Sequence, residues 1–337
     1  MDRPHTATND GPAERTVQLA GGSTFTVSIP KGWAQERDIG PGTGLFIYPF
    51  EDRLVVAPSD RAGDERTAVL ETDRLETDVL RRRIRAAYAA GADEIAVRSG
   101  TGVDTDARRA ARTAVTELVG VEVAEETETE LVVRSLLDST EVSLARTIEQ
   151  LRGLVVPMHR EAVEAVVTDD AGFAQRVADR DDDVDRLFAL VCRQFYRVLQ
   201  DVREVDRLEA DRLEAFTRFR VARYLERVAD HAERIAAVAE HQSTAPNPAV
   251  GDRLESLGAD ARGVLTTALD GDARAALERR ATVRADLDEF DRRLYDEGGD
   301  DAYRYGRALE GIRRTAENGG NVAEARALVG VTGDDGD

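Results

Sequence analysis

Hydrophobic and polar positions fall into three successive patterns along the chain. From residue 14 to residue 58, short apolar runs rich in β-branched and aromatic side chains alternate with turns that contain glycine and proline. The runs are Arg15–Ala20, Thr24–Ile29, Gly44–Pro49 and Arg53–Ala57. Such runs predict β-strands. Four strands in so short a stretch are too few to enclose a core, so we expect a second copy of the chain to complete it.

Between residues 66 and 136, strand-like and helix-like patterns alternate. The expected strands are 67–71, 94–98, 121–125 and 130–136, and the expected helices are about 76–90 and 106–119. This β-α-β-α-β-β order predicts a small α/β domain with helices packed on one sheet. Gly100 and Gly102 follow a strand but lack the third glycine of a dinucleotide-binding turn, so we expect a tight turn there. No residue pattern in this domain points to chemistry.

From Ser139 to about residue 328 the apolar residues recur with the period of a helix. Helices are expected at about 139–170, 172–200 and 207–241, and, after a break at Thr244–Pro248, at about 249–269, 272–297 and 300–328. Two sets of three helices indicate an internal repeat. The predicted fold class is therefore multidomain α+β, with three-helix bundles at 138–242 and 249–328. Residues 1–13 are expected to form a disordered leader and 329–337 an acidic tail.

Charge and cysteine content indicate the cellular compartment in which the protein is expected. The 337 residues carry 66 acidic and 46 basic side chains, a net charge of −20, and Lys31 is the single lysine. An acidic, arginine-using surface is typical of a salt-rich cytoplasm, where salt screens the repulsion between like charges. The one cysteine, Cys192, excludes an internal disulfide framework. We find no leader peptide and no apolar run near 18 residues, so a cytoplasmic protein without membrane insertion is expected.

Acidic residues with helical spacing are the clearest candidate site. Glu226, Asp230 and Glu233 fall in one stripe of a helix, and Asp181 and Asp185 form a second pair four residues apart, within an apolar face. Placing a carboxylate in an apolar face costs free energy unless a basic group or a metal ion neutralises it. Arginines such as Arg223 or Arg227 could neutralise the acids. Alternatively, two facing helices hold a metal ion between their carboxylates.

The two acidic motifs, Asp181–Leu187 and Leu225–Ile235, closely resemble the paired Glu/Asp-x-x-x-Asp motifs of the PhoU proteins. The resemblance covers roughly residues 138–328. It implies two similar three-helix bundles, a role in regulating phosphate uptake, and motif carboxylates that bind iron or zinc clusters. The metal ligands implied are Asp181, Asp185, Glu226, Asp230 and Glu233. Oxygen ligands without cysteine favour iron, manganese or magnesium over structural zinc.

The second bundle keeps only part of this motif. When the two repeats are aligned, Asp185 corresponds to Asp291 and Asp230 to Glu317, whereas Asp181 corresponds to Leu287 and Glu226 to Arg313. Two of the four carboxylates are thus replaced, one of them by a base. We therefore expect metal only in the first bundle.

The N-terminal stretch resembles a SpoVT/AbrB-type swapped-hairpin domain. The resemblance rests on Ser28–Lys31, on a helix-like segment from Trp33 to Asp38, and on the glycine-rich turn Gly40–Gly44. It implies an intertwined dimer that binds DNA. Carried over by position, the candidate DNA contacts are Arg15, Ser23, Thr24, Thr26 and Lys31. Segment 14–58 has four basic and five acidic residues, a net charge of −1, which also leaves open a domain that only dimerises.

Together these resemblances predict a homodimeric, phosphate-responsive transcription regulator of the haloarchaeal type. It would bind promoter DNA through its N-terminal domain and sense or dock through the PhoU-like bundles. The alternative is an adaptor that does not bind DNA and docks a phosphate transporter ATPase or a sensor kinase. Nucleophilic triads, P-loops and cysteine–histidine metal spacings are missing from the sequence, so we do not expect an enzyme.

Overall fold

The computed structural model describes residues 13–49, 53–58, 66–72, 75–137, 142–201, 204, 212–297 and 299–332, with only the backbone of Glu297 and of residues 329–332. Contacts divide the chain into two units, residues 1–64 and 65–337. The predicted leader, the linker at 59–65 and most of the acidic tail lie outside the described residues. In the described part, no helix is long and apolar enough to cross a membrane.

The first unit contains two separate antiparallel hairpins. Strand β1 (Gln18–Ala20) pairs with β2 (Thr24–Thr26), and β3 (Leu45–Pro49) pairs with β4 (Leu54–Pro58). Between them lies helix α1 (Lys31–Gln35), which starts two residues before the predicted helix. Gly21 and Gly22 have φ angles of 62° and 81°, which glycine adopts without strain, and they close the first hairpin. None of this unit's described residues is buried.

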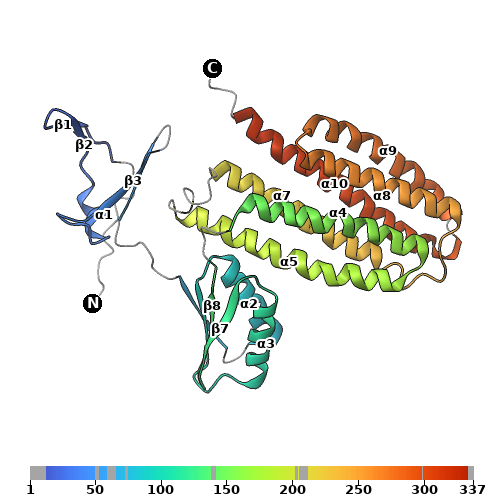
Figure 1. Cartoon of the computed structure of the whole chain (residues 1–337), viewed down its shortest axis with the longest axis horizontal. Coiled ribbons are helices and arrows are strands. Elements are labelled where there is room, and N and C mark those ends of the chain that lie inside the picture. Colours follow the sequence, from blue (N-terminus) through green and yellow to red (C-terminus); the bar gives the residue numbers. More distant parts are fainter. Residues whose placement is uncertain are drawn as a thin grey trace, which may run out of the picture. The chain divides into compact units, whose positions relative to one another are not determined.

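Residues 66–137 form an α/β domain whose elements follow the predicted order. They are β5 (Thr67–Glu71), α2 (Thr77–Ala89), β6 (Glu94–Arg98), α3 (Thr105–Thr116), β7 (Val121–Glu126) and β8 (Glu130–Ser135). The sheet order is β5-β6-β8-β7, in which β5 and β6 are parallel and the other neighbours antiparallel. Both helices cover one face of the sheet (Figure 1). Ile84 and Ala111 pack there against Ile95, Val97 and Leu131.

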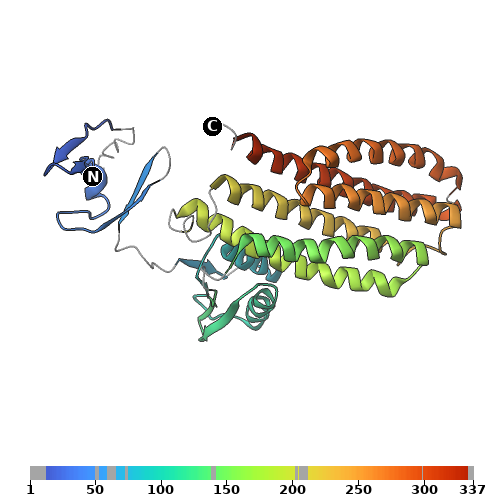
Figure 2. The same cartoon turned by 45° about the horizontal axis from the view of Figure 1, so that its top comes forward.

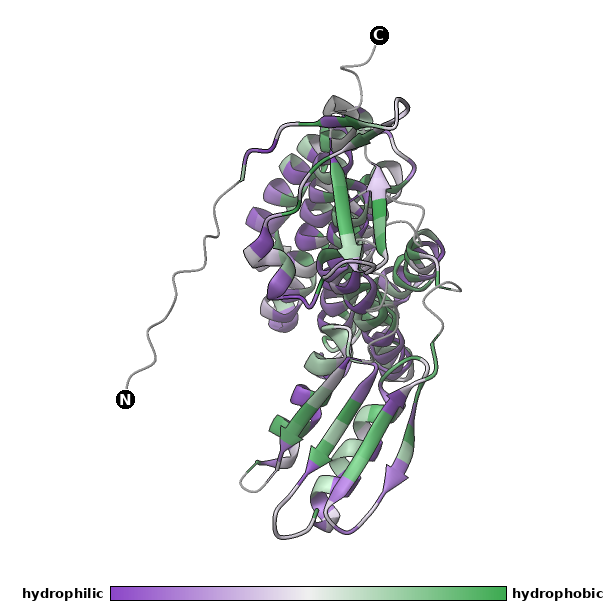
Figure 3. Ribbon diagram, turned by 90° about the vertical axis from the view of Figure 1, so that its left-hand side faces the viewer, coloured by the Kyte–Doolittle hydropathy of each residue, from purple (hydrophilic) through white to green (hydrophobic). Residues whose placement is uncertain are grey.

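The other face of the sheet carries cross-strand ion pairs. Arg134 pairs with Glu94 at 3.0 Å and Arg98 with Glu130 at 2.6 Å, and each pair joins directly opposite residues of β6 and β8. Ala96 lies between them on β6 and is buried. Figure 3 shows the four strands with apolar residues along their middles and polar residues at their ends.

Six long helices form the C-terminal part. They are α4 (Leu144–Thr168), α5 (Ala171–Gln200), α7 (Arg212–Ala236), α8 (Pro248–Leu269), α9 (Ala273–Glu297) and α10 (Ala302–Thr332), with a short 3-10 helix at Gly299–Asp301. They lie side by side in both views (Figures 1 and 2). Side-chain caps mark several starts, as at Asp170 and Asn247. The two sets of three helices share one continuous hydrophobic core, which runs from Leu144 to Ala323.

Close packing of α7 and α8 on α10 depends on glycine. A Cβ atom at Gly319 would lie 2.8 Å from the backbone nitrogen of Leu265, and one at Gly311 would lie 2.5 Å from a side-chain carbon of Ile235. Real Cβ atoms do not approach other heavy atoms this closely, so a side chain at either position would force a neighbour to shift. Gly319 thus lets the backbones of α8 and α10 come together within the second set, and Gly311 makes room on α10 for Ile235 of α7, which belongs to the first set.

Candidate functional site

The five predicted metal ligands lie along the junction of α5 and α7, and we call them the acidic seam. Asp181 and Asp185 come from α5; Glu226, Asp230 and Glu233 come from α7. Leu225, Val228, Ala232 and Ile235 of α7 are buried in the core. This places the acids at the edge of a packed surface, as their spacing predicts. The Glu226 side chain is 14% exposed, Asp185 36% and Asp230 37%.

Electrostatics show that the acids of the seam act on one another. Burial, together with repulsion from Glu233, Asp185, Asp230 and Glu226, raises the pKa of Asp181 to about 7. Burial also raises the pKa of Glu226 to about 7, with the charge of Asp230 adding to the effect and Arg223 opposing it. The pKa of Glu233 is raised for the same reasons. Near neutral pH the seam therefore holds protons that isolated carboxylates would have lost.

Arginines neutralise part of the seam. Arg223 pairs with Glu226 at 3.3 Å, as one alternative from the sequence anticipated, and Arg234 pairs with Asp230 at 3.7 Å. The shortest contact comes from outside the bundles: Arg85 of α2 donates to Asp185 at 2.7 Å. Residues 85 and 185 are a hundred positions apart, so helical spacing gave no signal for this pair.

The seam has the donor atoms that a metal ion needs, but its side chains are not positioned to hold one. Its carboxylate oxygens suit hard cations, and Oε2 of Glu226 is buried without a hydrogen-bond partner. In the described residues, however, no three Asp, Glu, His or Cys side chains gather closely enough to hold an ion. Asp185 is turned toward Arg85. A metal would have to draw Asp185 away from Arg85, and the metal site stays a prediction.

The corresponding place in the second bundle is built differently. Leu287 is completely buried, and Arg313, which replaces Glu226, pairs with Asp288 of α9 at 2.5 Å and with Glu310 at 3.5 Å. Glu317 pairs with Arg314 at 2.8 Å. In the second bundle the guanidinium group of Arg313 thus neutralises an acid of α9. In the first bundle the carboxylate of Glu226 takes the place of that guanidinium group.

Sequence reasoning missed the arginines that fix the α/β domain to the first bundle. Arg193 of α5 is 2% exposed and pairs with Asp93 at 2.8 Å. It also donates to the carbonyl oxygens of Tyr88 and Ala92. Arg197 pairs with the same Asp93 oxygen at 2.6 Å and with Glu204 at 2.9 Å. The only signal in the sequence was a charged residue beside the predicted core position Cys192.

The predicted DNA contacts are all exposed in the first unit: Arg15, Ser23, Thr24, Thr26 and Lys31. Thr24 and Thr26 lie on β2, on either side of Phe25, and Thr26 donates to the carbonyl of Gln18 at 3.3 Å. Arg15 donates to the carbonyl of Glu14. Their exposure leaves them accessible, and DNA binding stays a prediction.

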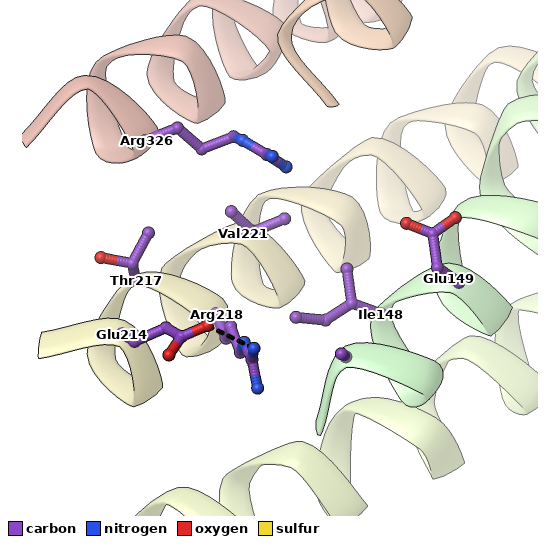
Figure 4. Close-up of a pocket in the computed structure, with 8 residues that line it drawn as sticks. Ile148, Glu149, Glu214, Thr217, Arg218, Val221 and Arg326 are labelled. Atoms are coloured by element: carbon purple, nitrogen blue, oxygen red, sulfur yellow. Dashed lines mark hydrogen bonds and ion pairs between the residues drawn. The ribbon is translucent and has the colours of Figure 1, made fainter. Parts of the chain in front are cut away.

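A separate cavity of about 430 Å³ opens where α4, α7 and α10 meet (Figure 4). Its lining is Ala145, Ile148, Glu149, Glu214, Thr217, Arg218, Val221 and Arg326. Both guanidinium groups already have partners, because Arg218 pairs with Glu214 and Arg326 donates to the carbonyl of Leu269 at 2.9 Å. No residue of the acidic seam lines it, so this cavity is not the predicted site.

The helices that carry the seam match the model of a known protein family. Residues 148–239 match the family model described as PhoU domain, and this range contains all five seam residues. Among solved structures, PhoU from Pseudomonas aeruginosa is 19% identical, with a TM-score of 0.43 over 56% of this chain and 96% of that one. The phosphate transport system regulatory protein PhoU from Streptococcus pneumoniae is 16% identical, with a TM-score of 0.45 over 58% and 96%. No curated protein matches the chain.

Proposed function

We propose that this protein is a PhoU-like regulator of phosphate transport that acts in the cytoplasm. The observation that carries the proposal is the match of residues 148–239 to the PhoU domain. The matched helices hold four carboxylates, Asp181, Asp185, Glu226 and Asp230, at the four-residue spacing of the motif that the sequence resembles, with Glu233 on the same side of α7. We propose a regulatory and binding role rather than an enzymatic one.

The first unit supports a finer proposal, that the regulator is a homodimer that binds promoter DNA. Eight large apolar side chains of this unit are exposed: Val17, Leu19, Phe25, Val27, Ile29, Phe46, Ile47 and Leu54. A two-stranded hairpin is marginal on its own. Burying these side chains against a second copy would supply the missing core, because apolar surface removed from water contributes roughly 25 cal/mol per Å². The polar residues of β2 and Lys31 would then face the DNA.

An electrophoretic mobility shift in high potassium salt tests this proposal, with DNA from upstream of phosphate-uptake genes. The substitutions Arg15→Glu and Lys31→Glu together should weaken binding to all sequences. They should also reduce the slope of log affinity against log salt by about 2, since two phosphate contacts are lost. Arg82→Glu with Arg83→Glu is the matched control, because it changes the net charge equally on the exposed side of α2.

Two outcomes would count against DNA binding. If both double variants weaken the shift equally, the effect is general charge repulsion. If the parent protein binds no DNA, the adaptor function is favoured, in which the first unit only dimerises and the bundles dock a phosphate transporter ATPase or a sensor kinase. The near-neutral charge of segment 14–58, −1, is the feature that keeps this second function in view.

We also propose that the acidic seam is neutralised by protons and by a metal ion such as iron, manganese, magnesium or zinc. Asp181, Glu226, Asp230 and Glu233 would hold it, together with Asp185 once released from Arg85. The ion would supply the positive charge that the five carboxylates lack. Because Arg85 belongs to the α/β domain, occupancy of the seam would then loosen one contact between that domain and the first bundle.

A further inference from the structure

Positive charge is concentrated on one layer of the α/β domain. Helices α2 and α3 together carry seven arginines and two aspartates, a net charge of +5, in a chain whose net charge is −20. Both helices lie on the same face of the sheet (Figure 1). A patch of this sign on an acidic protein attracts anions.

Within this layer, α3 forms one wall of a groove of about 460 Å³. Its lining is Thr105, Arg108, Arg109, Arg112, Thr113, Thr116 and Glu126. The six α3 residues recur at intervals of three and four, so they share one side of the helix. The opposite side carries the buried alanines, such as Ala107 and Ala111. The groove is therefore edged by guanidinium and hydroxyl groups, with one carboxylate.

The groups of the groove divide into fixed and available ones. Arg108 is fixed, because it pairs with Glu126 at 2.6 Å and donates to the carbonyl oxygens of Val103, Thr127 and Glu128. Arg112 gives one nitrogen to Glu126, and its side chain is 59% exposed. Arg109 is 74% exposed and contacts Asp106 at 3.2 Å. Two guanidinium groups can thus turn toward a ligand while Arg108 holds the groove in shape.

We propose that this groove binds a compact anion with two or more linked phosphate groups, such as inorganic tripolyphosphate or a nucleoside triphosphate. Guanidinium and hydroxyl groups are good partners for phosphate oxygens. The ligand has to compete with Glu126 for Arg112 and with Asp106 for Arg109. An anion with several charges close together does so better than a single phosphate. The proposal does not depend on the regulatory function proposed above.

The surroundings of the groove favour a compact ligand over a nucleic-acid duplex. Strand β7, the turn after it and the start of β8 carry Glu122, Glu125, Glu126, Glu128 and Glu130, and Arg108 ties this turn to α3. The phosphates of a long duplex would reach these glutamates and be repelled. No aromatic side chain lines the groove, so it offers no surface on which bases could stack.

Isothermal titration of the full-length protein with inorganic tripolyphosphate, at constant high potassium chloride, tests the proposal. We expect saturable binding, at least tenfold weaker binding of orthophosphate, and at least tenfold weaker tripolyphosphate binding after Arg109→Gln with Arg112→Gln. Arg82→Gln with Arg83→Gln on α2 is the matched control and should bind as the parent does. Titration with ATP identifies the source of the phosphates: equal affinity assigns the site to the phosphate chain, and tighter binding assigns it to a nucleotide.

Three results would overturn the proposal. The first is no binding of tripolyphosphate or ATP by the parent. The second is equal weakening by the two double variants, which would indicate attraction by the whole basic layer. The third is competition by random-sequence duplex DNA at equal phosphate concentration, which would assign the surface to a nucleic-acid backbone. Circular dichroism of each variant shows whether it is folded, and Thr113→Val provides a neutral second variant that should also weaken binding.

Discussion

The buried Arg193 of α5 and the partly exposed Asp93, in the turn before β6, form an ion pair with an N–O distance of 2.8 Å. The guanidinium also lies over the ring of Tyr88, 5.1 Å from its centre. Burial lowers the pKa of Arg193, and the charge of Asp93 opposes that effect. Arg193 donates to the carbonyl oxygens of Tyr88, in the last turn of α2, and of Ala92, in the turn after it. The α/β domain is therefore fixed to the first bundle at this point.

Replacing Arg193 with methionine should loosen this attachment. The change removes one donor from Asp93 and one from each of two carbonyl oxygens, and breaking a fully buried ion pair costs about 3–5 kcal/mol. Because Arg197 still pairs with Asp93, we expect the lower end of that range. Thermal unfolding and limited proteolysis between the α/β domain and α4 are the measurements. Arg83→Met, at an exposed position of α2, should change stability by about 0.5 kcal/mol or less; similar losses in both variants would contradict the docking role.

The order of helices and strands could be predicted because it follows from local periodicity. In the α/β domain, strands Thr67–Glu71 and Glu94–Arg98 have the expected bounds. The predicted break between the helices at 139–170 and 172–200 is present, and Asp169 ends α4 with a φ of 56°. In the first unit β1, β2 and β3 are shorter than predicted, with β1 beginning at Gln18 rather than Arg15, and β4 is shifted by one residue. That unit lacks a core within one chain, so little holds its strand ends in place.

The acidic seam could be predicted only in part. Spacings of four and seven residues place Glu226, Asp230 and Glu233 on one side of α7 whatever the tertiary structure. Arg223 is close in sequence to Glu226, so their pairing could be anticipated. The contact between Arg85 and Asp185 depends on how the α/β domain docks, which periodicity does not encode. The contacts of Arg193 could not be predicted from the sequence for the same reason.

The seam should make stability depend on pH in a recognisable direction. Asp181 and Glu226 have pKa values of about 7 in the folded protein, against ordinary values of 3.8 and 4.5. The folded state therefore binds more protons than the unfolded state between about pH 4 and pH 7. By linkage, the stability from these groups is fully present below about pH 4 and is lost as the pH rises through 7. Asp181→Asn should flatten this part of the profile.

Denaturant unfolding of parent and variant between pH 5 and pH 8.5, at constant high salt, checks this. His159 provides an internal control of opposite sign. It is completely buried, and burial with the nearby Arg262 charge lowers its pKa to about 3, so its contribution is lost as the pH falls below about 6.5. Asp181→Asn keeps the contribution of His159, so the difference between the two profiles reports Asp181 alone. Parallel profiles between pH 5 and pH 7 would contradict the role assigned to Asp181.

The exposed apolar surface of the first unit predicts the assembly. Deleting residues 1–60 should yield a smaller species by light scattering in high salt, because the dimer is expected to form through residues 14–58. Phe25, which is 75% exposed, allows a milder test: Phe25→Asp should dissociate the dimer, whereas Asp38→Asn on the same unit should not. An unchanged number of chains per particle after the deletion would reject the swapped-hairpin dimer.

Metal binding at the seam would appear as stability that a chelator removes. A ligand at one hundred times its dissociation constant stabilises a folded protein by about 2.7 kcal/mol. We expect iron, manganese, magnesium or zinc to raise the unfolding temperature of the parent. Asp185→Asn and Glu226→Gln should each remove most of that gain, because each deletes a carboxylate of the seam. Asp291→Asn, the matched change in the second bundle, should leave the gain nearly intact.

Arg85→Gln separates a metal site from a seam neutralised by arginine. Arg85 holds Asp185 at 2.7 Å, so an ion in the parent has to break that pair, whereas in Arg85→Gln the carboxylate is already free. If the seam binds metal, this variant should respond at lower metal concentration than the parent, although it is less stable without metal. If parent and variants respond to chelator alike, or purified parent contains no metal and gains none, arginines and protons neutralise the seam. Arg85→Gln would then lower stability at every metal concentration by the same amount.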